Sequence, residues 1–284
     1  MLSPAAFPAL FVLLWSTGFI GAKSGLPYAE PATFLVLRFG LVLVLLLPIC
    51  LAFRAPWPDR KGFGRMFVAG VFLQAGYLGG VFAAIHHGMP AGISALITGL
   101  QPLSTALLAG WLLKEPITAR QWSGLVLGLV GALLVVGERI QVAGMSGLSI
   151  ALAVLALASI TLGTIWQKKH GAGVDLRTGA AIQYIAAAAV LAPFALALET
   201  REVHWTGEFV LAIFWLAIVL SLGAVFLLLY LIRHGAATRV ASLFYLVPPT
   251  TALMAWPLFG ETYSLLSAAG MGLAMLAVWL VTAK

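Results

Sequence analysis

The sequence predicts an all-α membrane protein of ten transmembrane helices, and this prediction rests on its composition, its hydropathy pattern and an internal repeat. Hydrophobic residues make up 62% of the 284 residues and charged residues 9%, against about 50% and about 25% in a typical soluble domain. So few charges cannot cover the surface of a water-soluble globule of this size. Helices are the expected spanning elements, because stretches such as residues 39–49 are apolar throughout, whereas the strands of a membrane barrel alternate apolar and polar residues.

Hydropathy places ten apolar runs along the chain. Each run has roughly the 20 residues that a helix needs to cross the hydrocarbon core of a bilayer. Turn sequences such as Gly25-Leu26-Pro27 separate the runs, and no connection is long enough for a separate soluble domain. The predicted spans are residues 7–24, 32–53, 64–86, 91–113, 119–137, 147–168, 177–198, 208–233, 237–258 and 263–282.

The Lys and Arg residues are distributed unequally between the two sides of this arrangement. Of the 16 in the chain, twelve fall on the side of both termini, Arg38 lies within the second span, and three fall on the other side: Lys23, Arg139 and Arg201. Cytoplasmic loops of membrane proteins carry the excess of Lys and Arg, so both termini are predicted to be cytoplasmic. Because the basic residues alternate with spans, the net charge of +7 does not indicate a nucleic-acid partner.

The two halves of the chain match each other in order, at a nearly constant offset. Offsets of 145 to 147 residues align Lys23 with Lys168, Arg38 with Gln183, Pro48 with Pro193, His87-Gly88 with His234-Gly235, Pro102 with Pro249, Glu115 with Glu261 and Gly124 with Gly270. We interpret these matches as an internal repeat. Its copies are residues 1–138 and residues 147–284, which together form one integral membrane unit.

Each copy contains five spans, and this number determines how the two copies are oriented in the membrane. Because five is an odd number, the second copy enters the membrane from the opposite side, and the two copies are inverted. Inverted repeats recur in transporters, with the binding site near the bilayer midplane where the repeats meet. Such symmetry suits alternating access, since two similar halves can exchange inward- and outward-open shapes at similar energy.

Short motifs occur in both halves of the chain. They are Trp15-Ser16-Thr17-Gly18 with Lys23, Arg38, Gln101-Pro102 leading into Lys114-Glu115-Pro116, and Pro248-Pro249 leading into Gly260-Glu261-Thr262. Together they resemble the EamA-type transporters of the drug/metabolite transporter superfamily over essentially the full chain. The overall pattern is most similar to the bacterial aromatic amino-acid and metabolite exporters of that superfamily.

The resemblance implies a basket-like bundle in the bacterial cytoplasmic (inner) membrane. The fourth, fifth, ninth and tenth helices are then expected to form a scaffold. The central cavity is expected to be lined mainly by the first, third, fourth, sixth, eighth and ninth helices. Its occupant is expected to be a small metabolite, most of all an aromatic or other hydrophobic amino acid that is exported.

Polar or aromatic residues within the spans are the candidate substrate-binding residues. They are Trp15, Gln74, Tyr77, Gln101, Tyr230 and Tyr245. Polar groups inside a membrane are costly unless they face protein or water. Gln74 and Tyr77 are three residues apart and therefore share a helix face, while an aromatic wall at Trp15 suits a ligand with a flat apolar part. The alternatives are interhelical hydrogen bonds for the polar groups and an interfacial belt for the tryptophan.

Away from the span ends, Arg38 is the one charged residue of the predicted spans. We expect it to pair with Glu30 or Glu261 rather than to bind substrate, because both carboxylates are predicted on the nearby side. All nine Asp and Glu residues lie in loops or at span ends. The sequence therefore favours facilitated transport over a proton relay through a buried acid.

Two glycine-rich faces occur at matching positions, at Gly124 and Gly128 in the fifth span and at Gly270 and Gly272 in the tenth. Glycines permit close approach of membrane helices. We expect these faces to form scaffold contacts, with a homodimer contact as the open alternative.

The competing functions are a channel-like pore and an integral-membrane enzyme. A channel usually gathers its pore from several subunits or from a ring of like groups, and the inverted repeat favours a carrier instead. The chain has no metal-binding His-Glu-x-x-His, no Gly-x-Ser-x-Gly and no paired intramembrane Asp. We therefore predict no catalytic residues, no metal and no cofactor; the partners are a small-molecule substrate and the lipid bilayer.

Overall fold

The computed structural model describes residues 6–89, 94, 97–112, 117–137, 146–247, 249–250, 253–254 and 264–282. Within these ranges the regular structure is helical, apart from one isolated antiparallel bridge between Ala29 and Val203. This bridge joins two loops that are far apart in the sequence. The described part of the chain is therefore an all-α structure.

The helices of the first half are long and follow one another closely. They are α1 (Phe7–Gly25), α2 (Pro31–Ala52), α3 (Arg60–Gly70) continuing through η2 (Val71–Gly76) into α4 (Tyr77–His86), α6 (Gln101–Leu112) and α7 (Ala119–Gly137). The second half repeats this order. Its helices are α8 (Gly147–His170), α9 (Leu176–Leu198), α10 (Gly207–Trp215) continuing through η3 (Leu216–Ala224) into α11 (Val225–His234), α12 (Ala237–Ser242) followed by η4 (Leu243–Leu246), and α14 (Leu265–Thr282).

Five continuous helical segments are long and apolar enough to cross a membrane. They are Pro31–Ala52, Arg60–His86, Gly147–His170, Leu176–Leu198 and Gly207–His234. Each coincides, within four residues at either end, with one of the predicted spans. The predicted class, an all-α membrane protein, is confirmed at this level.

Local sequence explains where several of these helices begin. Pro31 occupies the first position of α2, where its missing N–H costs no hydrogen bond. Asp59 and Thr206 accept hydrogen bonds from backbone N–H groups of the first turns of α3 and α10, and Ser146 does the same for α8. Such caps satisfy donors that a helix N-terminus leaves free.

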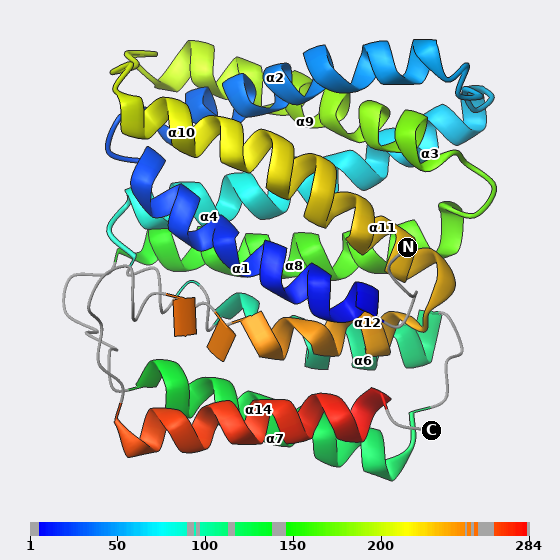
Figure 1. Ribbon diagram of the computed structural model, residues 1–284, viewed down its shortest axis with the longest axis vertical. Helices are drawn as coiled ribbons and strands as arrows, with labels where there is room; N and C mark the ends of the chain where they lie inside the picture. Colours follow the sequence, from blue (N-terminus) through cyan, green and yellow to red (C-terminus); the bar gives the residue numbers. More distant parts are fainter. Residues whose placement is uncertain are drawn as a thin grey trace.

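Helices from the two halves are interleaved in space (Figure 1). Helix α2 packs against α9, α7 packs against α14, α1 packs against η3, and α4 packs against α8. Figure 1 places the α2–α9 pair at one end of the long axis and the α7–α14 pair at the other, with α1, α4 and α8 between them. Helix α1 begins, and α14 ends, on the same side of the bundle.

Wide helical turns with i→i+5 hydrogen bonding interrupt the two longest helices, at η2 and η3. Their first residues, Val71 and Leu216, are 145 positions apart, so the turns fall at matching places in the two halves. Such turns are rare and occur often at functional sites. Both turns adjoin the cavity described below.

Glycines bring α7 and α14 into close contact. A Cβ on Gly124 would lie 2.9 Å from the carbonyl oxygen of Ala277, and one on Gly131 would lie 2.7 Å from that of Gly270. The glycine-rich face of α7 therefore packs within the protein, against α14. Gly272 has open space where a Cβ would stand, so a homodimer contact on that side of α14 stays a prediction.

Candidate functional site

A cavity of about 340 Å³ lies between α1, α2, α4 and the two wide turns. Its inner part is formed by buried residues, among them Trp15, Gln74 and Leu220. Its other part reaches the helix ends, where Pro27 and His86 are exposed. The cavity therefore runs from the middle of the bundle to the end where α1 and α4 terminate, and we call this end the mouth.

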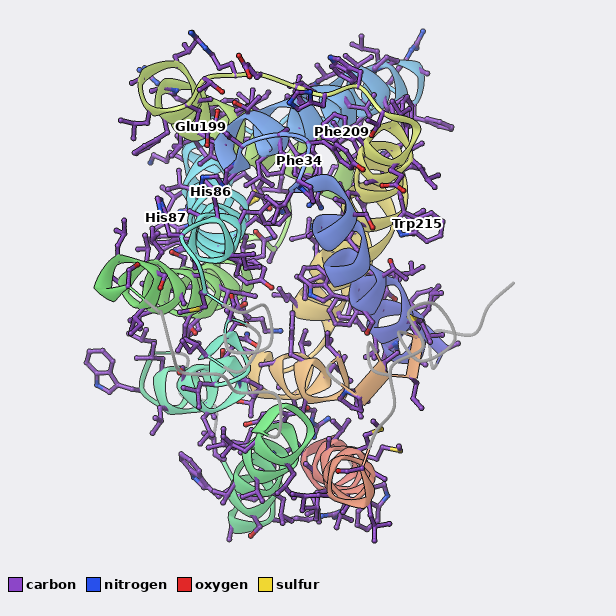
Figure 2. All side chains as sticks on the ribbon, turned by 90° about the vertical axis from the view of Figure 1, so that its left-hand side faces the viewer. Phe34, His86, His87, Glu199, Phe209 and Trp215 are labelled. Carbon is purple, nitrogen blue, oxygen red and sulfur yellow. The ribbon has the colours of Figure 1, made fainter. Side chains whose placement is uncertain are left out.

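Figure 2 views the bundle from the mouth. His86 lies on α4 at this end, and Phe34 and Phe209 lie together above it, with ring centroids 5.4 Å apart. Phe34 also contacts the ring of Phe82, a cavity residue, at a centroid distance of 5.6 Å. A chain of aromatic contacts therefore connects the cavity residue Phe82 to Phe34 on α2 and to Phe209 on α10.

Trp15 forms part of the cavity wall and is held by other rings. Its ring centroid lies 5.2 Å from that of Phe11 and 5.3 Å from that of Phe244. These contacts join α1 to η4 and fix the orientation of the indole, which is 7% exposed. A fixed aromatic surface of this kind suits a flat apolar group.

Gln74 and Tyr77 supply polar groups to the same cavity. Gln74 lies in η2 and Tyr77 begins α4, and their side chains are 3% and 5% exposed. The wide turn places both residues on the cavity side. Three of the six predicted site residues, Trp15 being the third, are thus brought together.

The other three predicted residues lie outside the lining of this cavity. Gln101 is buried on α6 and donates from Nε2 to Thr105 Oγ1 at 3.2 Å. The ring of Tyr230 packs against Phe7, with centroids 5.3 Å apart, near the end opposite the mouth.

Tyr245 is packed between η4 and α7. Its hydroxyl donates to the carbonyl oxygen of Leu125 at 2.9 Å, and its ring fills the space where a side chain on Gly128 would stand. This geometry favours a packing role over the predicted cavity wall. The sequence offered a signal for it in the glycine at position 128.

Hydroxyl groups in the spans mostly bond within their own helices. Ser16, Thr161 and Thr164 each donate to the carbonyl oxygen four residues earlier, at 2.7 to 2.8 Å. Such bonds satisfy a hydroxyl in an apolar setting without a partner helix. These residues therefore give little indication of a binding site.

Arg38 has a different partner from the first of the two that the sequence suggested. The expected pairing with Glu30 is wrong, because Glu30 instead accepts hydrogen bonds from Thr200 and from the backbone of Arg201. Glu261, the other expected partner, lies outside the described residues. Arg38 lines the cavity and donates from Nε to Ser221 Oγ at 3.0 Å.

Loops at the mouth end are tied together by carboxylates. Glu199 accepts from the backbone of Ala32 and from both the backbone and the hydroxyl of Thr33, at 2.7 Å each. Glu30 and Thr200 form the reciprocal contact at 2.6 Å. The hydrogen bond from the Thr200 hydroxyl holds the pKa of Glu30 below its ordinary value, with the backbone N–H groups of residues 200 and 201 acting in the same direction.

At the end opposite the mouth, cationic side chains bond to backbone carbonyls. Lys168 Nζ donates to the carbonyl oxygen of Gly235 at 2.6 Å. Arg233 Nη2 donates to the carbonyl oxygen of Gly171 at 3.0 Å and also to that of Val174. These bonds join the ends of α8 and α11 to neighbouring loops.

The fold and the cavity define a helical membrane protein with an internal binding space that is open at one end. Comparison with known families matches the EamA-like transporter family twice, over residues 4–137 and over residues 147–283. The chain belongs to this family and is a membrane transporter.

Similar proteins carry related names. A Bacillus subtilis protein named uncharacterized transporter YvbV is 26% identical over 288 residues, covering 97% of this chain and 90% of its own length. A Salmonella typhimurium protein named probable amino-acid metabolite efflux pump is 27% identical over 283 residues, with 95% and 92% covered. The Escherichia coli K12 protein named uncharacterized inner membrane transporter YedA is 26% identical over 280 residues, with 97% and 90% covered.

A solved crystal structure shares the fold. It superposes with a TM-score of 0.80 at 22% sequence identity, covering 98% of this chain and 96% of the other. This likeness concerns the arrangement of the helices alone.

Proposed function

We propose that this protein exports small metabolites, most of all aromatic or other hydrophobic amino acids, by alternating access through the central cavity. The observation that carries the proposal is a cavity closed at one end of the bundle and walled in its middle by Trp15, Gln74 and Tyr77. A ring, an amide and a phenol together suit an amphipathic ligand with a flat apolar part. The name of the Salmonella relative agrees with this substrate class.

We further propose that ten spans form two inverted repeats, residues 1–138 and 147–284. Matching contacts support this proposal. Gly18 packs against Leu220, with 2.8 Å from a Cβ on the glycine to the leucine side chain, and Gly163 packs against Leu73 at the same distance. The glycines are 145 positions apart and the leucines 147, as the repeat requires. The double family match supports the same division.

The proposed location is the bacterial inner membrane, with both termini in the cytoplasm. The excess of Lys and Arg on the side of the termini supports this orientation. The mouth then faces away from the cytoplasm, and the bonds of Lys168 and Arg233 close the cytoplasmic end. In this orientation the arrangement is that of an outward-open carrier.

Gln101 and Tyr230 remain proposed site residues for the inward-open half of the cycle. Tyr230 lies on α11 near the closed end, beside Phe7 and His234. Gln101 keeps a buried Oε1 without a hydrogen-bond partner among the described residues. A second, cytoplasmic half-cavity that opens when the mouth closes would give both residues access to substrate.

The experiment is counterflow in proteoliposomes with a panel of labelled amino acids. We expect saturable exchange of at least one aromatic or hydrophobic amino acid, and a strong loss of rate in Gln74→Ala and Tyr77→Ala at unchanged insertion. Rates that rise linearly with concentration would indicate a channel-like pore instead, and chemical conversion of the label would indicate an enzyme. Absence of exchange for the whole panel would refute the proposed substrate class.

A further inference from the structure

Arg38 is a buried cation on the wall of the cavity, in the first half of α2. Its side chain is 1% exposed. Nε donates to Ser221 Oγ at 3.0 Å, and Nη2 is buried without a hydrogen-bond partner among the described residues. Within the same part of the chain, no carboxylate forms an ion pair with Arg38. The guanidinium therefore has one donor atom, Nη2, without a partner among the described residues, although its side chain lines the cavity.

A guanidinium buried in a protein is unfavourable unless a negative group or several acceptors compensate it. Charged residues inside membranes almost always pair, or face a water-filled cavity or a substrate path. The planar guanidinium also matches a carboxylate in a two-point, charge-assisted contact. We propose that Arg38 binds the carboxylate of the transported molecule, an assignment that rests on the proposed function and specifies its substrate as an apolar or aromatic carboxylate.

The other lining residues of the cavity also suit an apolar or aromatic carboxylate. Trp15, Tyr77 and Phe82 give it aromatic walls, and no Asp or Glu is among its described lining residues. A carboxylate therefore finds a cationic partner in the middle of the cavity, whereas an ammonium group finds no carboxylate there. His86 is the other basic residue of the lining, but it lies exposed at the mouth, where water screens it.

A packing role alone does not require the charge. At the matching position of the second half, 145 residues later, stands the neutral Gln183. Its Nε2 donates to Gln167 Oε1 at 3.0 Å and thus links α9 to α8. In the second half an uncharged amide links two helices at this position, whereas in the first half the matching residue is a cation that lines the cavity. The charge that distinguishes Arg38 from Gln183 thus lies on the cavity wall.

The test compares carboxylates with their neutral amides on the purified full-length protein in detergent. The probes are phenylalanine with phenylalaninamide, and 3-phenylpropionate with 3-phenylpropionamide, titrated by calorimetry. The variants are Arg38→Gln and Arg38→Lys. Ser221→Ala removes the observed partner of Arg38 but keeps the guanidinium, and Arg201→Gln removes an exposed cation in a loop at the mouth end.

We expect the wild type to bind the carboxylate of at least one pair at least about tenfold more tightly than its amide. Arg38→Gln should abolish this preference while still binding the amide, Arg38→Lys should restore part of it, and Ser221→Ala and Arg201→Gln should keep it. If carboxylate and amide bind alike in both pairs, or if neither carboxylate binds, the proposal is overturned. A preference that persists in Arg38→Gln overturns it equally.

If Arg38→Gln fails to fold, the other proteins still test the proposal. The carboxylate preference of the wild type and of Ser221→Ala, and the partial preference of Arg38→Lys, are measured on proteins that keep a cation at this position. The failure of the proposed function is also distinguishable. If 3-phenylpropionate binds in an Arg38-dependent manner while no amino acid is exchanged in proteoliposomes, the carboxylate site stands and the amino-acid substrate class fails.

Discussion

The rings of Phe39 and Tyr184 lie with their centroids 5.6 Å apart, and the two residues are 145 positions apart in the sequence. Under the proposed repeat they are equivalent, so each contacts its own counterpart where α2 meets α9. The axis of the proposed repeat would pass through this contact. The preceding residues, Arg38 and Gln183, depart from this symmetry, since one bonds to η3 and lines the cavity and the other bonds to α8.

Cysteine labelling tests the orientation of the bundle. In a Cys50→Ala background, we expect His87→Cys to react with an impermeant maleimide added to intact cells and Arg60→Cys to react only after permeabilisation. Both positions are exposed and lie at opposite ends of the α3–α4 helix. His87 is preferable to Gly88, whose φ of 89° disfavours a side chain. The reverse labelling pattern would invert the proposed topology.

Some of this site could be predicted from the sequence, because helical spacing fixes which residues share a face. Gln74 and Tyr77 are an example, and both line the cavity. Spacing does not reveal which helix a face meets. Tyr245 therefore resembled a cavity residue, although it packs on Gly128. The hydrogen bond of Arg38 to Ser221 could not be predicted for the same reason, because the two residues are 183 positions apart.

The proposed repeat rests on an offset that is visible in the sequence itself, whereas the wide turns could not be predicted from the sequence. Nothing in the apolar sequences of η2 and η3 distinguishes them from ordinary helix. Their geometry depends on long-range packing, such as that of Gly76 against the Ser159 side chain on α8. A pattern of apolar residues does not encode such contacts.

The role of Trp15 in the cavity wall can be tested by comparison with a second tryptophan, Trp111. Replacing Trp15 with Ala removes a wall of the cavity and ring contacts with two phenylalanines, so we expect transport to fall about tenfold or more. Trp111→Ala is the control, because Trp111 on α6 is 76% exposed. We expect it to transport at the wild-type rate. Equal effects of the two variants in counterflow, normalised to the amount of inserted protein, would contradict the assignment.

Tyr245 is expected to affect stability more than transport. Tyr245→Phe removes the hydrogen bond to the carbonyl oxygen of Leu125 and keeps the ring on α7. Hydrogen bonds between membrane helices contribute about 0.6 kcal/mol on average, so a small decrease in the unfolding midpoint in detergent is expected, with an unchanged KM for transport. A raised KM at an unchanged midpoint would instead place Tyr245 in the substrate path.

Low pH is expected to destabilise the loops at the mouth, because Glu30 becomes protonated. Since the folded state lowers the pKa of Glu30 through the Thr200 hydroxyl, its stabilising contribution is complete above the ordinary value of 4.5 and is lost as the pH falls below it. The melting temperature should therefore decrease on acidification, and Glu30→Gln should reduce that decrease. Glu202→Gln is the control, because Glu202 is an exposed carboxylate in the loop between α9 and α10 that contains Thr200. An identical pH profile for wild type and Glu30→Gln would exclude this contribution.

Arg233 is expected to control the closed end of the bundle. Arg233 bonds to the carbonyl oxygens of Gly171 and Val174. We expect these bonds to break when that end opens, so Arg233→Gln should favour the inward-open state. A hydrogen bond to a charged group contributes about 1.5–3 kcal/mol, enough to shift a two-state equilibrium by about tenfold or more. The measurement is the rate at which an impermeant maleimide added outside labels Ala22→Cys, a cavity position, in the Cys50→Ala background.

Labelling of Ala22→Cys should slow when Arg233→Gln is added, because the outward-open state becomes less populated. Arg239→Gln is the matched control, since Arg239 is an exposed cation on the neighbouring α12. It should leave the rate unchanged, and it corrects for any general effect of charge on that side. An unchanged or faster rate in Arg233→Gln would mean that these bonds do not hold the closed end, and that closure depends instead on apolar packing such as that of Tyr230 against Phe7.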